Sequence, residues 1–106
     1  MYGDIIIQGA TAFTDYNGIY EFHQILNDHA SYKRIGMEQD YYVYKYLDGN
    51  IYIAPGFNIS ITIYYTSSND ILNAKWFVSM SFFTGIGMWD SAESSLKLTV
   101  RYKTYP

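Results

Sequence analysis

The two histidines are the first residues of this chain that could do chemistry. His23 and His29 stand six residues apart, with Glu21 and Asp28 close by, and such a group could in principle hold a metal ion. Zinc needs three or four ligands in a defined geometry, and the chain has no cysteine to complete the set. We therefore interpret both histidines as surface or turn residues, and we expect no metal and no cofactor.

Carboxylates and hydroxyls could support hydrolysis, but their neighbours do not suit it. Glu38 and Asp40 lie two positions apart, as a carboxylate pair for glycoside cleavage would on a strand. They precede a tyrosine-rich strand in what we interpret as a solvated loop. No serine lies in a Gly-x-Ser-x-Gly turn, and Gly85-Ile86-Gly87 lacks the third glycine of a dinucleotide site. We expect no catalytic residue and a protein that is not an enzyme.

The tyrosines between residues 41 and 53 are the most informative group. Side chains there alternate with a period of two, as a strand requires, and Asp48-Gly49 suits a tight hairpin turn. One strand face carries Tyr42, Tyr44 and Tyr46, and the other carries Tyr41, Val43, Lys45 and Leu47. At most one row can lie fully in the core, so the other should be a ladder of exposed or half-exposed rings. In an alternative interpretation, sheet and loops cover both rows.

Short strands in close succession must position these side chains. We expect strands at residues 4–8, 19–23, 31–35, 41–47, 51–54, 59–65, 76–83 and 96–102. The strongly apolar 76–83 segment should be a central strand, whereas residues 70–75 could form a single helical turn capped by Asp70. About eight short strands predict one all-β domain over residues 1–106, an antiparallel sandwich or small barrel.

The composition of the chain limits the classes of partner that we expect. The net charge is −3, and the seven lysines and arginines form no basic patch, so we expect no nucleic-acid partner. The apolar run at residues 5–7 is far too short for a membrane span, so we expect no membrane insertion. Charged residues make up only 16% of the chain and aromatic residues 20%, which favours surfaces that meet other protein or sugar.

A second apolar group follows residue 79. Trp89 stands in Gly87-Met88-Trp89-Asp90, outside the expected strands, where a large apolar residue is either a core plug or an interface anchor. The segment is more apolar than the edge of a small domain should be, which indicates a multimer or a docking surface. The candidate interaction surface therefore comprises Tyr42, Tyr44, Tyr46, Phe83, Met88 and Trp89.

Several short motifs occur in a specific order along the chain. They are Ile5-Ile6-Ile7-Gln8-Gly9-Ala10, Asn17-Gly18-Ile19-Tyr20, Tyr32-Lys33, Tyr41-Tyr42-Val43-Tyr44, Tyr64-Tyr65-Thr66-Ser67 and Lys75-Trp76. The series resembles a short β-rich module that recurs in bacteriophage virion proteins and other surface-associated proteins. The resemblance spans residues 5–78. The chain departs from the module after the Asp-Gly turn, where Ile51 or Tyr52 stands in place of the tryptophan that the family often has.

The resemblance implies a structural role in a phage particle, as a capsid decoration, head-fibre or tail accessory component. We therefore expect a non-enzymatic virion protein, assembled in the host cytoplasm. Its aromatic-rich sheet surfaces would dock onto capsid or tail proteins and onto copies of itself. The alternative is a carbohydrate-binding module that recognises host surface glycans with exposed rings.

Overall fold

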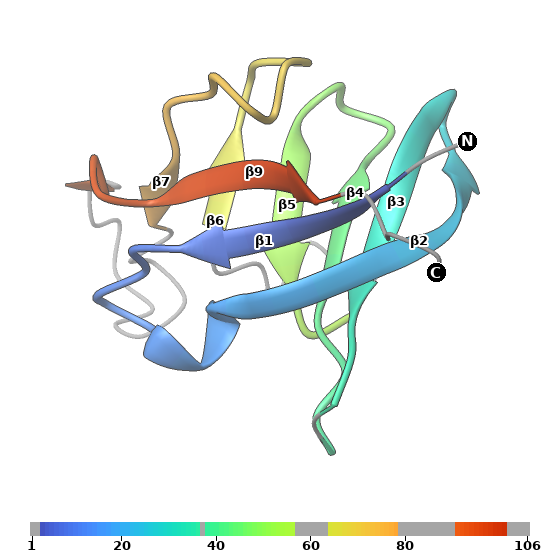
Figure 1. Cartoon of the computed structure of the whole chain (residues 1–106). Helices are drawn as coiled ribbons and strands as arrows, with labels where there is room; N and C mark the ends of the chain where they lie inside the picture. Colours follow the sequence, from blue (N-terminus) through green and yellow to red (C-terminus); the bar gives the residue numbers. More distant parts are fainter. Residues whose placement is uncertain (1–2, 37, 57–63, 79–90, 102–106) are drawn as a thin grey trace.

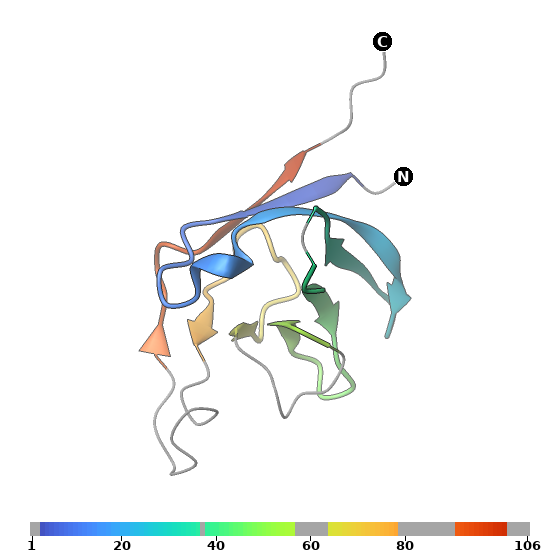
Figure 2. The ribbon, with the colours of Figure 1, turned by 90° about the horizontal axis from the view of Figure 1, so that it is seen from below.

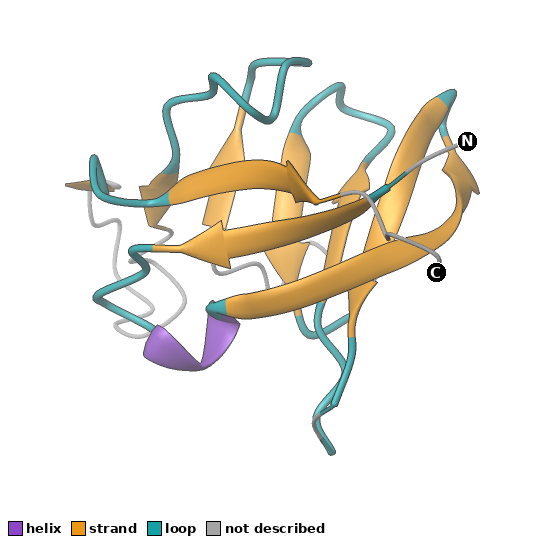
Figure 3. Ribbon diagram, in the orientation of Figure 1, coloured by secondary structure: helices purple, strands orange, loops and turns teal. Residues whose placement is uncertain are grey.

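Nine antiparallel strands make up almost all of the regular secondary structure in the described residues. The computed structural model describes residues 3–36, 38–56, 64–78 and 91–101 (Figure 1). The strands are β1 (Asp4–Gln8), β2 (Gly18–Leu26), β3 (His29–Arg34), β4 (Tyr42–Lys45), β5 (Ile51–Ala54), β6 (Tyr64–Thr66), β7 (Phe77–Val78), β8 (Ser91–Ala92) and β9 (Lys97–Arg101). A single helical element accompanies them in the described ranges, the 3-10 helix η1 (Thr14–Tyr16), purple in Figure 3. The expected all-β antiparallel fold class is confirmed.

The strands form one sheet that curls into a half-barrel. Its order is β8-β7-β6-β5-β4-β3-β2-β1-β9, so the two terminal strands of the sheet are consecutive in the chain. In Figure 1, β1, β2 and β9 cross in front of β4, β5, β6 and β7 at a steep angle, and Figure 2 shows the curl from below. A bulge in β2 between Phe22 and Gln24 adds to the bend, because bulges increase local twist.

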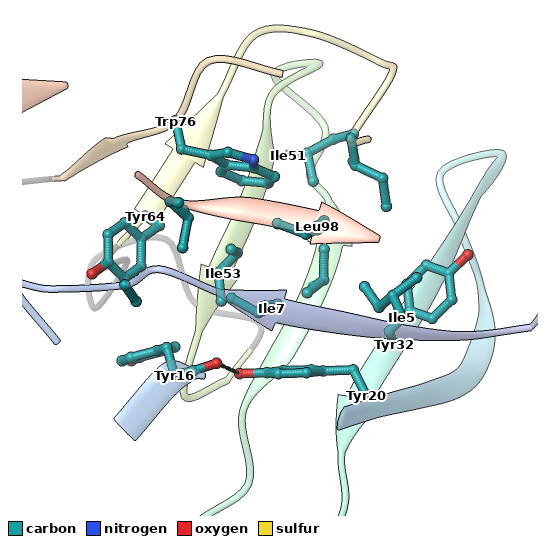
Figure 4. Packing of buried hydrophobic residues seen from close by; sticks show 14 of the residues in the cluster. Ile5, Ile7, Tyr16, Tyr20, Tyr32, Ile51, Ile53, Tyr64, Trp76 and Leu98 are labelled. Carbon is teal, nitrogen blue, oxygen red and sulfur yellow. Dashed lines mark hydrogen bonds between the residues drawn. The ribbon is translucent and has the colours of Figure 1, made fainter. Parts of the chain in front are cut away.

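The main core fills the space between these two layers (Figure 4). Ile5 and Ile7 of β1 and Leu98 of β9 face the other layer, where Trp76 is the largest side chain among those almost fully buried. The Tyr20 hydroxyl donates to the Tyr16 carbonyl oxygen at 2.8 Å, which satisfies a buried polar group. Burial raises the pKa of both tyrosines, so both phenols stay neutral.

One buried glutamate connects the two layers near the edge strands β8 and β9. Glu93 lies between β8 and β9, and its backbone N–H donates to the Trp76 carbonyl oxygen at 3.0 Å. Its Oε1 accepts hydrogen bonds from the Thr11 hydroxyl at 2.7 Å, the Ala12 N–H at 3.2 Å and the Thr11 N–H. Beside it, the Ser95 hydroxyl donates to the Gly9 carbonyl oxygen at 2.7 Å. The segment after β1 is thereby tied to the β8–β9 connection.

The expected strands agree with the structure where apolar and polar residues alternate clearly or an apolar run is well bounded. The 4–8 and 51–54 strands match β1 and β5 in full, and β9 shows the expected alternation of buried Leu98 with exposed Lys97 and Thr99. Strand β2 runs three residues past its expected end. The hairpin turn is Asn27-Asp28, with φ of 52° and 63°, a left-handed conformation that these two residue types tolerate.

Two expectations need correction. Strand β7 is not central, because it lies second from the edge of the sheet, between β6 and β8; residues 79–83 lie outside the described part. Residues 70–75 do not form a helix: residues 70–73 make one turn, in which the Asn73 N–H donates to the Asp70 carbonyl oxygen at 3.2 Å. The expected cap is confirmed, because Asp70 Oδ1 accepts the Leu72 N–H at 3.2 Å. Of the expected 59–65 strand, the described part contains Tyr64 and Tyr65, within β6.

Gly9→Ala tests how closely β1 and the β8–β9 connection approach each other. A Cβ at Gly9 would overlap the Ser95 carbonyl oxygen, and its φ of 78° also disfavours alanine. We expect a loss of about 2–4 kcal/mol in the free energy of unfolding, measured by urea denaturation. The control is Gly49→Ala, with φ of 89° and no heavy atom within 4 Å of the added Cβ. Equal losses in both variants would contradict the close approach.

Glu93→Gln tests the carboxylate that joins the layers. Burial alone raises the pKa of Glu93, but hydrogen bonds from Thr11, Tyr64 and Ala12 outweigh it, and the pKa lies below its usual value. Such a carboxylate stabilises the fold above its unfolded pKa of about 4.3, and this contribution disappears as the pH falls through the folded pKa. We expect the variant to lose about 1–3 kcal/mol near neutral pH.

Urea denaturation of wild type and variant at a series of pH values checks this linkage. The stability difference between them should shrink as the solution becomes acidic. A difference that stays constant from neutral to acidic pH would show that the charge of Glu93 contributes nothing to folding.

Candidate functional site

The expected tyrosine row lies on the outer face of the curled sheet. Val43 of β4 points into the main core and is 1% exposed, whereas Tyr42, Tyr44 and Tyr46 belong to a second, separate cluster. Tyr42 and Tyr46 are half-buried, as the ladder interpretation predicts. Tyr44 is only 2% exposed, so an exposed ladder is wrong for this residue. Its ring packs beside Tyr52 of β5, with the centroids 6.0 Å apart.

We call this second group the outer-face cluster. It consists of Leu26, Tyr42, Tyr44, Tyr46, Tyr52, Ala54 and Tyr65, extended by Phe77 through its ring contact with Tyr65. The strand register produces the contacts, because Tyr44 pairs with Tyr52, Tyr52 with Tyr65, and Tyr65 with Phe77. Cross-strand aromatic pairs of this kind each stabilise a sheet by about 0.2–1 kcal/mol. The cluster therefore runs continuously across β4, β5, β6 and β7.

The rings of the cluster do not form one flat platform. The planes of Tyr46 and Tyr52 meet at 77° and those of Tyr52 and Tyr65 at 42°, while Tyr65 and Phe77 stack at 25° with centroids 5.6 Å apart. The Lys75 ammonium lies 5.6 Å from the Phe77 ring centroid. Tilted and offset pairs such as these are the arrangements that aromatic rings prefer with one another.

An open pocket of about 330 Å³ lies at the end of the cluster beside the hairpin turns. It is lined by Gln24, Leu26, Asn27, Tyr44, Lys45, Tyr46 and Leu47. The Asn27 side-chain amide donates to the Lys45 carbonyl oxygen at 2.8 Å, which ties the β2–β3 turn to β4. Leu47 is 81% exposed. The size and the mainly apolar lining are typical of a small-ligand site or a side-chain docking site.

Asp48 orders the turn that carries Leu47. Its Oδ1 accepts the Asn50 N–H at 2.9 Å, and its Oδ2 accepts the Tyr52 hydroxyl. The Gly49 N–H donates to the Tyr46 carbonyl oxygen at 3.0 Å, which closes the expected Asp-Gly turn. Burial and then the hydrogen bond to Asp48 raise the pKa of Tyr52, so its hydroxyl stays a protonated donor. The turn therefore presents Leu47 on a fixed backbone.

The other residues that could do chemistry are dispersed. His29 Nδ1 lies 2.9 Å from the Ala30 carbonyl oxygen, and the His23 ring packs 5.5 Å from the Tyr42 ring. Glu38 and Asp40 are both exposed, and Asp40 pairs with Lys33 at 3.7 Å. Within the described ranges, no three His, Cys, Asp or Glu side chains gather closely enough to hold a metal ion.

Three of the six residues expected on the interaction surface, Tyr42, Tyr44 and Tyr46, belong to the described part of the structure. Further aromatic residues lie next to them. Phe83, Met88 and Trp89 lie outside the described residues. Tyr65 and Phe77 join Tyr42, Tyr44 and Tyr46 on the outer face, and the alternation of their strands could have revealed them. The pocket residues carried no such signal, since Gln24 and Asn27 reach the pocket from a different hairpin.

The fold and its surface define a small all-β half-barrel with an aromatic outer face. Comparison with known proteins found no matching family model, and no curated protein or solved structure with significant similarity to the chain. The likeness to the virion module thus rests on the motif series alone. In the described ranges, no helix has the length and apolar character needed to cross a bilayer.

Tyr44→Ala and Leu47→Ala compare the buried centre of the cluster with the exposed leucine beside it. Tyr44 is almost fully buried, so its truncation should cost about 3–5 kcal/mol of unfolding free energy. Leu47 is 81% exposed, and its truncation should change stability by less than about 0.5 kcal/mol. Urea denaturation of both variants checks the contrast. Similar losses would mean that Tyr44 contributes no more to the fold than a surface residue does.

Proposed function

We propose that this protein is a non-enzymatic structural component of a bacteriophage particle that docks through its outer-face cluster. The observation that carries the proposal is the row of aromatic rings on the outer face of the curled sheet. When one face of an antiparallel sheet packs on a core, the other face normally carries polar side chains. Half-buried rings such as Tyr42, Tyr46, Tyr65 and Phe77 instead offer apolar area that a partner would bury.

The partners in this proposal are capsid or tail proteins and further copies of the chain. Aromatic residues are enriched at protein interfaces and often carry most of the binding energy there. Because a particle displays many equivalent sites, a weak contact at each becomes firm attachment overall. The virion location, with assembly in the host cytoplasm, is supported by the ordered motif series. The role within the particle is that of a capsid decoration, head-fibre or tail accessory component.

A carbohydrate-binding module for host surface glycans is the second candidate, and the pocket is the observation that favours it. The Tyr44 and Tyr46 rings line the pocket beside the Gln24 and Asn27 amides. Rings can stack on the apolar face of a sugar while amides bond its hydroxyls.

Tyr65→Ser tests docking, because it removes a half-buried ring from the middle of the cluster. Truncation of an aromatic hot-spot residue costs about 2 kcal/mol or more, so we expect at least about thirtyfold weaker binding and correspondingly less variant on the particle. The measurement is quantitative mass spectrometry of density-gradient-purified phage particles from cells that express each variant. Leu72→Ser is the matched control, since Leu72 is 43% exposed and lies outside the cluster. Denaturation curves establish that both variants fold.

Two results distinguish the virion role from the carbohydrate-binding module. Absence of the wild-type chain from purified particles would contradict the virion role. Binding of the monomeric wild-type chain to a glycan array, lost in Tyr46→Ala, would favour the carbohydrate-binding module.

A further inference from the structure

We propose that two copies of this chain pair through the pocket end of the outer-face cluster, with Leu47 of each copy packed over the pocket of the other. The inference rests on the proposed docking function and names one surface for it. It begins with Leu47, whose exposed fraction of 81% is the highest among the large hydrophobic side chains of the described ranges. The next highest is Ile25 at 49%.

The projecting side chain and the pocket belong to the same patch. Leu26, Tyr44, Tyr46 and Leu47 form the apolar part of the pocket lining. Leu47 lies on the rim of the pocket, since its side chain is also 81% exposed. A patch that carries both a projection and a recess is self-complementary. A two-fold axis beside it brings each projection opposite the recess of the other copy. Because one patch supplies both features, a second copy can satisfy both contacts at once in an isologous pair.

Charges around the patch fit the same two-fold arrangement. Lys45 lines the pocket, while Asp28 and Asp48 are exposed on the two turns next to it. In an isologous contact, Lys45 of one copy faces the acidic turns of the other. Opposite charges meet across the interface, which favours the correct register over wrong ones.

The patch is also held rigidly before any contact forms. The Asn27 amide bonds the Lys45 carbonyl oxygen at 2.8 Å, and the Tyr46 N–H bonds the Asn50 carbonyl oxygen at 2.9 Å. The two carboxylate oxygens of Asp48 accept hydrogen bonds from the Asn50 N–H and the Tyr52 hydroxyl, which orders the turn after Tyr46. A preorganised surface loses little conformational freedom on association, which lowers the free-energy cost of pairing.

Sedimentation equilibrium of the purified chain tests the pairing over a wide range of protein concentrations. We expect a monomer–dimer equilibrium for the wild type. In Leu47→Asp, the dissociation constant should rise at least about a hundredfold, because two leucine contacts are lost per dimer. The matched control is Leu72→Asp, which changes another exposed leucine outside the patch and should leave the equilibrium unchanged.

Cross-linking locates the contact, since the chain has no cysteine of its own. A mixture of Leu47→Cys and Gln24→Cys chains should give a disulfide-linked heterodimer under mild oxidation, because Leu47 of one copy lies over the pocket wall of the other. A mixture of Leu72→Cys and Gln24→Cys chains is the control and should give only background.

Three results would overturn the pairing: a monomer at every concentration, a dimer that Leu47→Asp leaves unchanged, or cross-linking no stronger than in the control. None of them touches the proposed docking function, which is tested by Tyr65→Ser on the particle. Conversely, a dimer that is lost in Leu47→Asp supports the pairing even if the chain is absent from particles.

Discussion

The buried residue Glu93 connects the two layers of the curled sheet through hydrogen bonds. Its backbone N–H bonds Trp76, next to β7, and its side chain accepts hydrogen bonds from Thr11 and Ala12, after β1. One residue thereby joins the two layers that enclose the core. The three hydrogen bonds to Oε1 compensate for part of the water that the carboxylate has lost. Gly9 allows the segment after β1 to approach the β8–β9 connection closely, since a side chain at this position would overlap Ser95.

Once the sheet is curled, period-two alternation decides which tyrosines face outward. Val43 and Ile53 fill the interior, so Tyr44 and Tyr52 must lie on the other side of the same strands. Strand register then places Tyr65 and Phe77 next to them and creates a continuous aromatic surface. The surface is partly a second core, because Tyr44 and Tyr52 are buried. The half-buried rings around these two residues are the part available to a partner.

The fold class could be predicted from the sequence because strand periodicity and turn chemistry are local properties. Asp48-Gly49 closes a hairpin through bonds within five residues, and the alternation of Lys97, Leu98 and Thr99 reflects one buried and one exposed face. Prediction failed where the outcome depended on distant partners. The 76–83 segment looks central because it is apolar, but apolar character reports burial, not the position of β7 within the sheet.

Residue patterns alone were enough to predict antiparallel strands with tyrosines on alternating faces, because side-chain direction follows from backbone geometry. They also identified Tyr42, Tyr44 and Tyr46 as one row. Three features became visible only in the folded chain: Tyr44 is buried, Leu47 lies at a pocket, and Glu93 connects two layers. These outcomes need residues far apart in the chain to meet. Such contacts depend on how the sheet curls, and no local pattern encodes that.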